Sequence, residues 1–282
     1  MKNRTMIISG YIMMMLATLI PLATFGRMLW QSYSQEERYH SFQKGLSADY
    51  VDSIEGKSVQ YNNQLNDKNT GIVDPFLGNY ETDYGLDLDE SYAFGYLSIP
   101  SISVIEPVYL GADLQHLAMG LGHVAGTSLP TGKGTERAVV AGHRAEPSHV
   151  FFRYLDQIAV GDKLYFDNGK SILIYQMVSN EIISPSEWEK LEPLDGKTMM
   201  TLITCDPLPT FHNRLLVHFE FIKSIPSSSL DVSDSEVQIA FTKEAQKNSR
   251  ASKASLVHIG ICVLSIILLL LVIVKFYRFL KN

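Results

Sequence analysis

Two apolar segments, one near each end of the sequence, constrain the architecture of this chain most strongly. Residues 6–25 contain no charged side chain, and the only ionisable groups within residues 256–274 are His258 and Cys262. A helix of about twenty apolar residues is long enough to cross the hydrocarbon core of a bilayer. The sequence therefore predicts two transmembrane helices, with a region between them that folds outside the lipid.

Basic residues beside these segments indicate the orientation of the chain. They precede the first segment and follow the second, at Lys2, Arg4, Lys275, Arg278 and Lys281. Because cytoplasmic flanks are enriched in Lys and Arg, and two spans return the chain to its starting side, we expect both termini in the cytoplasm. The region between the spans is then extracytoplasmic in a two-span protein of the cell membrane. Residues 1–26 are a retained anchor or, alternatively, a cleavable signal segment, although the cleavage pattern at Thr24-Phe25-Gly26 is poor.

The region between the spans divides by composition. Residues 27–91 are polar and predict short helices, residues 92–223 are β-rich, and residues 224–255 are rich in Ser and Asp and predict a polar tether. Residues 256–274 and 275–282 are then the second span and a basic cytoplasmic tail. The β-type runs are residues 93–99, 103–110, 137–143, 163–167, 171–179, 198–205 and 214–222. Many short strands predict a small closed barrel or a sandwich, and apolar spacing predicts one helix near residues 147–157.

Charge and cysteine usage exclude some functions. The net charge is −6, and no basic cluster lies away from the predicted spans, so nucleic acid is not expected as a partner. Cys262 belongs to the second span, which leaves Cys205 as the single thiol of the exported region and excludes a disulfide framework there. A metal site at Cys205, Asp206 and His212 would lack the paired-ligand spacing of such sites. We expect no metal and no cofactor.

Three side chains in the β-rich region could form an acyl-transfer site. Cys205 ends the apolar run TLITC, His143 ends the run VVAGH, and Arg214 begins the next run after the cysteine. Taken singly, each residue is more often structural or a solvated charge. Together, a thiolate attacks an amide carbonyl, an imidazole moves protons, and a guanidinium binds the peptide or the oxyanion.

The residues around these three resemble the motifs of the sortase family. TLITC, AGHR and the run N-R-L-L-V occur in the family's order of His, Cys and Arg. The resemblance extends over LSIPSISVIEPVYLG and GLGHVAGTSLPTGKGTERAVVAGH, and so covers most of residues 93–222. It implies a mainly β fold: an eight-stranded barrel with a few short helices, an N-terminal helical and lid extension, and two flanking transmembrane helices.

The resemblance also implies an activity and its residues. The chain would be a cysteine transpeptidase that cleaves an LPXTG-like sorting signal between Thr and Gly through a thioacyl enzyme. Cys205 would be the nucleophile, His143 the general acid and base, and Arg214 the group that stabilises substrate or oxyanion. Candidates for the substrate pocket are Ile203 and Thr204, which precede the cysteine, and Leu129.

A segment upstream of the barrel bears on the class of sortase. IVDPFLG contains Asp74, Pro75 and Phe76, which resemble the lid of class C, pilin-polymerising sortases of Gram-positive bacteria. In physical terms, Asp74 could pair with Arg214 while Phe76 packs over the thiol. Class C implies pilin or surface proteins with LPXTG-like signals as partners, and a lysine of the next pilin as acceptor. The loop CDPLPTFHNR and the strand RLLVHFEF depart from the usual class C pattern, which leaves substrate selection open.

Two alternatives remain. A class A-like or accessory sortase would attach surface proteins to the cell wall rather than polymerise pilins. A surface-binding module without activity would keep the barrel but would not need all three catalytic residue types.

Overall fold

The computed structural model describes residues 2–67, 72, 74–76, 84–86, 92–144, 149, 151–227, 235–242 and 252–281. The chain divides into two compact units. One comprises residues 1–34, 147–149 and 251–282, and the other comprises residues 35–146 and 150–250.

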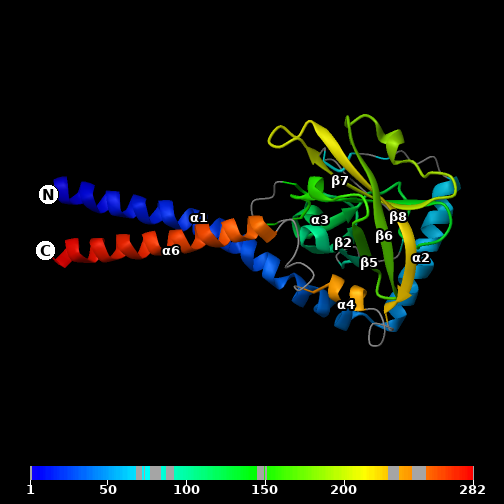
Figure 1. The fold of residues 1–282 in the computed structure, drawn as a ribbon, viewed down its shortest axis with the longest axis horizontal. Coiled ribbons are helices and arrows are strands. Elements are labelled where there is room, and N and C mark those ends of the chain that lie inside the picture. The colour runs from blue at the N-terminus through cyan, green and yellow to red at the C-terminus, as the bar shows by residue number, and fades with distance from the viewer. Residues whose placement is uncertain are drawn as a thin grey trace. The chain divides into compact units, whose positions relative to one another are not determined.

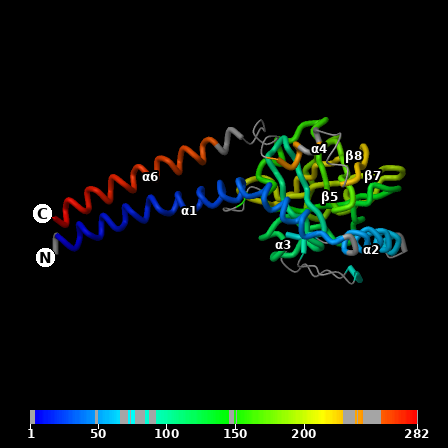
Figure 2. Tube along the Cα trace, turned by 90° about the horizontal axis from the view of Figure 1, so that it is seen from below, coloured from blue at the N-terminus to red at the C-terminus, as the bar shows by residue number. Residues whose placement is uncertain are grey.

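The first unit consists mainly of two long helices, α1 (Lys2–Gly45) and α6 (Ser252–Lys281). Within them, Arg4–Gly45 and Leu256–Lys281 are long and apolar enough to cross a membrane. The helices lie side by side (Figures 1 and 2), and the rings of Tyr11 and Phe276 are 5.3 Å apart. The rings of Phe25 and His258 stack at 5.1 Å. Helix α1 continues through Gln35 into the second unit. The sequence predicted short helices from residue 27 onward, but residues 27–45 belong to this one long helix.

The second unit is built on a closed β-barrel, as predicted (Figure 1). Its strands are β1 (Gly95–Ile99), β2 (Val104–Leu110), β3 (Leu121–His123), β4 (Glu136–Ala141), β5 (Lys163–Asp167), β6 (Ser171–Ile183), β7 (Thr198–Asp206) and β8 (Asn213–Pro226). They follow one another around the barrel in the order β1-β2-β3-β4-β7-β8-β6-β5, and β5 pairs with β1 to close it. The pairs β2–β3 and β4–β7 are parallel and the other pairs are antiparallel.

Most strands are buried on both faces, because other elements cover the outside of the barrel. Leu97, Val140 and Leu202 belong to the interior cluster, and Ile203 belongs to a separate outer cluster. Burial on both faces explains why these strands read as nearly continuous apolar runs. Full burial of one such leucine side chain contributes about 2 kcal/mol.

Short helical elements connect the strands. They are η1 (Pro100–Ile102), α3 (Leu114–Met119), η2 (Leu155–Gln157) and η3 (Trp188–Leu191). The helix expected near residues 147–157 is limited, among the described residues, to the turn η2. A continuous α-helix is excluded there because Phe151 has a left-handed backbone with φ of 35°. The backbone N–H of Phe152 donates instead to His143 O at 3.1 Å.

Helix α2 (Ala48–Asp67) packs against the barrel and precedes the lid segment (Figure 2). Ile54 and Tyr61 join the interior cluster. Asn62 exchanges two hydrogen bonds with the backbone of Leu129: Nδ2 donates to the carbonyl at 2.8 Å, and Oδ1 accepts from the N–H at 2.7 Å. The chain is therefore held to the barrel just before it enters the lid.

The segment expected to be a polar tether, residues 224–255, also contributes to the folded unit. Strand β8 extends to Pro226, and α4 (Ser235–Ala240) buries Val237 and Ala240 in an outer cluster with Tyr39 of α1. The rings of Phe241 and Tyr39 stack at 4.2 Å. Although the segment is mostly polar, its apolar residues Val237, Ala240 and Phe241 pack in this outer cluster.

Candidate active site

The ends of three neighbouring strands bring the predicted catalytic residues together. Strands β4 and β7 are parallel and their last paired residues are Ala141 and Ile203, so His143 and Cys205 each follow this pair by two residues at the same end of the two strands. Strands β7 and β8 are antiparallel and pair Cys205 directly with Arg214. Cross-strand neighbours have Cβ atoms about 5 Å apart. The cysteine therefore lies between the histidine and the arginine.

The alternation of side chains places all three on one face of the barrel. Ala141, Ile203 and Leu216 lie in the same outer apolar cluster. His143, Cys205 and Arg214 are each two positions from one of these residues along the strand direction. Because strand side chains repeat with a period of two, the imidazole, thiol and guanidinium share the outer face with this cluster.

Gly142 allows the strand before His143 to pass close to its neighbours. A Cβ atom at this position would lie 2.7 Å from Leu121 Cδ2 and 2.7 Å from Phe152 Cδ2, which is too close for ordinary packing. The Gly142 N–H donates to Ile203 O at 3.2 Å. Its carbonyl accepts from the Thr204 hydroxyl at 2.6 Å. The glycine thus keeps β4 against β7 up to the residue before the histidine.

Asp74 of the lid segment occupies one side of the Arg214 guanidinium. Arg214 Nη2 is 2.7 Å from Asp74 Oδ2, and Arg214 Nε donates to Asp74 Oδ1 at 3.3 Å. Both side chains are buried, with exposed fractions of 6% and 0%. A two-pronged arginine–carboxylate pair is both directional and strong when it is buried. Asp74, which the sequence assigns to a lid, is therefore bound by a buried ion pair to a predicted catalytic residue.

Two further lid residues complete the cover. Pro75 is buried, and the N–H of Phe76 donates to Asp74 Oδ1 at 3.0 Å. The Phe76 ring lies 5.2 Å from Arg214 Cζ and 6.2 Å from the His143 ring. Phe76 therefore contacts the guanidinium and the imidazole, and it also packs on the outer cluster with Ile72.

The environment of Cys205 opposes ionisation of the thiol in this structure. Burial raises the pKa of the thiol most strongly, and the Asp74 carboxylate adds to this effect. The charges of Arg214 and Arg144 lower the pKa but do not outweigh burial. The covered site thus favours the protonated thiol, which is the less reactive form.

A second set of contacts binds Tyr84, which lies ten residues after Asp74 in the sequence, to the barrel. The Tyr84 hydroxyl is 2.8 Å from His123 Nδ1 and also lies within hydrogen-bonding distance of His123 O. The backbone N–H of Gly111 donates to the same hydroxyl at 3.0 Å. His123 Nε2 lies 2.9 Å from Ser128 O, which can only accept, so Nδ1 is the acceptor toward Tyr84. Nothing in the sequence around Tyr84 signalled this anchor.

Sequence reasoning also missed Arg144, which follows His143 in the AGHR motif. Its guanidinium forms ion pairs with Asp206 and Asp156, and Nη1 donates to Cys205 O at 3.4 Å. The sequence could have indicated this role, because Arg144 is a charged residue that directly follows an apolar run and His143.

The three substrate-pocket candidates are all buried in the closed form. Thr204 is 0% exposed and bonded to Gly142, and Ile203 is 0% exposed in the outer cluster under the lid. Leu129 is 1% exposed in the barrel interior. Of the three, Ile203 shares the face of the thiol, whereas Thr204 points to the opposite side of strand β7.

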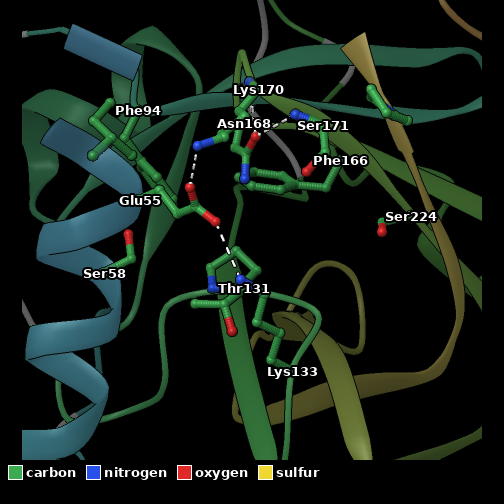
Figure 3. A pocket seen from close by; sticks show the side chains of 13 residues that line it. Glu55, Ser58, Phe94, Thr131, Lys133, Phe166, Asn168, Lys170, Ser171 and Ser224 are labelled. Atoms are coloured by element: carbon green, nitrogen blue, oxygen red, sulfur yellow. Dashed lines mark hydrogen bonds and ion pairs between the residues drawn. The ribbon is translucent and has the colours of Figure 1, made fainter. Parts of the chain in front are cut away.

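A separate cavity of about 260 Å³ lies at the other end of the barrel, before the start of β4 and at the end of β8 (Figure 3). Glu55 of α2 spans it between Lys133 at 3.2 Å and Lys170 at 2.5 Å. No cysteine or histidine lines it, so it is not the site of the acyl-transfer chemistry. Among the residues that the structure describes, no group of three or more His, Cys, Asp or Glu is placed to hold a metal ion.

Comparison with known proteins identifies the family. A family profile described as a sortase domain matches residues 97–221. The structure of sortase C-3 from Streptococcus pneumoniae is 52% identical, with a TM-score of 0.69 over 74% of this chain and 100% of that chain. Sortase C-1 from the same species is 30% identical, with a TM-score of 0.61 over 67% of this chain and 98% of that one.

Curated relatives match over a shorter stretch. Sortase A of Bacillus anthracis is 31% identical over 118 residues, which are 42% of this chain and 54% of that protein. The match to sortase A of Streptococcus agalactiae covers 60% of that protein. This chain therefore spans little more than half the length of these two relatives. The sortase profile, the barrel and the identity to a complete class C structure lead to one conclusion: the chain belongs to the sortase family of cysteine transpeptidases, with class C sortases as its structural neighbours.

Proposed function

We propose that this chain is a pilin polymerase that cleaves an LPXTG-like sorting signal between Thr and Gly and joins the Thr carbonyl to a lysine amine of the next subunit. The observation that carries the proposal is the cover that Asp74 and Phe76 form over the predicted catalytic residues. Asp74 pairs with Arg214 beside Cys205, and Phe76 contacts both Arg214 and His143. A site guarded in this way fits an enzyme that must avoid hydrolysis and wait for two protein substrates.

The catalytic roles follow from the positions of the three groups. Once the lid leaves, the Cys205 thiol transfers its proton to His143 and the thiolate attacks the Thr carbonyl carbon. Arg214 stabilises the resulting oxyanion with the donors that Asp74 had occupied. His143 then protonates the departing glycine amine, which leaves the Thr carbonyl bound to sulfur as a thioester.

The second half of the reaction reverses these proton movements. The lysine amine attacks the thioester carbonyl, and His143 accepts the proton that the amine loses. Collapse of the second oxyanion expels the Cys205 thiolate and forms an isopeptide bond between the two pilins. Water would give hydrolysis in place of transfer, so polymerisation requires that the lysine amine reach the thioester before water does.

Structural neighbours support the pilus role for this chain. One Streptococcus pneumoniae sortase C structure is described in terms of pilin substrate specificity, and one structure from Group B Streptococcus is described as a pilus-related sortase C.

For localisation, we propose that both long apolar helices cross the cell membrane, with both termini in the cytoplasm and the barrel outside. Substrates with LPXTG-like signals would then meet the site on the outer surface.

A second candidate is attachment of proteins to a cell-wall precursor. It is favoured by the curated relatives in sequence, which include sortase A proteins of Bacillus anthracis and Streptococcus agalactiae. Deletion of the gene separates the two roles. Loss of high-molecular-weight ladders of a surface protein from cell-wall extracts supports polymerisation, whereas unchanged ladders with loss of wall-anchored monomer would assign the chain to anchoring.

The assignment of the nucleophile is tested with a purified enzyme and a sorting-signal peptide. Cys205→Ala is expected to abolish cleavage, because no other described thiol lies on the catalytic face. Cys262→Ser is the matched control and should cleave normally, because Cys262 belongs to α6. If the Cys205 variant keeps more than about a tenth of the activity, Cys205 is not the nucleophile.

A further inference from the structure

The regular pairing of β4 with β7 ends just before the catalytic pair. The last paired residues are Ala141 and Ile203. His143 lies beyond the end of β4, and Cys205 lies near the end of β7. A strand end is less restrained than the middle of a sheet, so contacts beyond the strand pairing help to keep the imidazole beside the thiol.

Two side chains provide that interaction, one before and one after the catalytic residues. Thr204 donates from β7 to the Gly142 carbonyl at 2.6 Å, on the near side of His143. Arg144 reaches from the β4 end to the Cys205 carbonyl at 3.4 Å and forms an ion pair with Asp206, on the far side. His143 and Cys205 therefore lie between two cross-strand links.

Arg144 is built into this position rather than lying on the surface. Its side chain is 7% exposed, and its second ion pair, to Asp156 of η2, is 3.1 Å long. The Asp156 side chain is 51% exposed, whereas that of Asp206 is 12% exposed. The link to Asp206 is thus the buried one, and it involves the residue directly after Cys205.

We infer that Arg144 is a positioning residue for the reaction, which holds His143 and Cys205 at a fixed separation through Asp206 and the Cys205 carbonyl. It acts through geometry, because the planar guanidinium contacts the carbonyl and the carboxylate at once. Its charge has a separate effect, since it also lowers the pKa of the thiol. The inference rests on the proposed roles of Cys205 and His143.

Substitution of Arg144 separates the two effects. All variants carry Asp74→Ala, so that the lid does not limit the rate, and Cys262→Ser, so that Cys205 is the thiol that reacts. Arg144→Met is expected to lower kcat about tenfold or more with little change in KM, because misplacement of a reacting group costs rate rather than binding. The midpoint of the pH profile of Cys205 alkylation should move to higher pH.

Arg144→Lys keeps the charge without the planar group. It is expected to restore the alkylation midpoint but not kcat. Asp156→Asn is the matched control: it removes the exposed partner of the same arginine and should leave kcat within about twofold. Should Arg144→Met fail to fold, as judged by circular dichroism, Asp206→Asn replaces it and should lower kcat in the same way.

The inference is overturned if Arg144→Met and Asp206→Asn both keep kcat within about twofold, or if Arg144→Lys restores kcat fully. The second result would show that only the charge matters. Failure of the proposed function is distinguished from this, because it would appear as peptide cleavage by the Cys205→Ala enzyme. The alkylation profile uses no peptide and therefore reports on Arg144 in either case.

Discussion

At the scale of single residues, Arg214 divides its hydrogen-bond donors between two tasks. Nη1 donates to the carbonyls of Phe211 at 3.1 Å and Asn213 at 2.8 Å, which lie in the loop after the cysteine and at the start of β8. Nε and Nη2 bind Asp74. The first pair of contacts does not depend on the lid. The guanidinium can therefore stay oriented when Asp74 leaves, and two donors then face the space beside the thiol, as electrostatic stabilisation of an oxyanion requires.

His123 carries a pH dependence of stability. It is 0% exposed, and burial lowers its pKa from 6.5 to about 4. Between pH 6.5 and about pH 4, the unfolded chain therefore binds a proton at this histidine that the folded chain does not bind. The contribution of neutral His123 to stability is fully present above pH 6.5 and is lost as the pH falls toward 4. For this histidine alone, the free energy of unfolding should fall by roughly 2 kcal/mol between about pH 7 and pH 5.

Urea unfolding of the wild type and of His123→Gln at both pH values measures this contribution. The difference between the two pH values should be smaller in the variant by that amount. Glu106 and Glu136, whose pKa values are raised by burial, act in the opposite direction but are present in both proteins. Equal pH dependence in the two proteins would contradict the assignment.

At the scale of elements, the proposed lid and the chain at Tyr84 are each bound to the barrel. Asp74 binds Arg214 on one side, and Tyr84 binds His123 on the other. The Asp74 contact lies over the catalytic face, and the Tyr84 contact lies on the barrel at strand β3.

Weakening of the lid should increase the reactivity of the thiol. Asp74→Ala removes the ion pair with Arg214, and Phe76→Ala removes the ring that contacts Arg214 and His143. Both should speed alkylation of Cys205, because loss of the cover reduces burial and with it the pKa of the thiol. Asp52→Ala, which removes an exposed carboxylate beside Lys170, is the control and should react at the wild-type rate. Unchanged alkylation in both lid variants would mean that the DPF segment does not guard the site.

The sequence predicted elements better than their arrangement. The longer strands were visible as apolar runs, and the order of His143, Cys205 and Arg214 was visible in the motifs. Strand β3 was missed because Leu121–His123 is too short to show alternation and contains glycine. The expected helix near residues 147–157 was wrong because the φ of Phe151 and its contacts with the end of β4 are set by tertiary structure. The links made by Arg144 and Tyr84 join residues far apart in the chain, which one sequence cannot pair.

At the scale of the whole molecule, α1 contributes residues to both compact units. Within the barrel unit, Gln35 and Arg38 bind the buried Glu106 at 2.8 and 3.2 Å. Tyr39 donates to the buried Asp167 at 2.8 Å. The helix therefore satisfies two carboxylates on the barrel wall, and the barrel depends on a segment outside its own strands.

Two soluble fragments test this dependence. A chain of residues 35–250 keeps the donors to Glu106 and Asp167, and a chain of residues 48–250 lacks them. The shorter fragment should have a free energy of unfolding lower by about 3–5 kcal/mol, because a buried charge without its partner is strongly destabilising. Thermal or urea unfolding measures the difference. Equal stability would show that α1 is not needed to satisfy the barrel.

The central claim is that Cys205 carries the substrate as a thioester. Intact-protein mass spectrometry of the Asp74→Ala enzyme, quenched in acid after brief exposure to an LPXTG-containing peptide, tests it most directly. We expect an added mass equal to that of the peptide acid ending at its threonine less one water, released by hydroxylamine, located at Cys205 and absent after Cys205→Ala. An adduct at another residue, or cleavage of the peptide without any adduct when no amine is present, would contradict it.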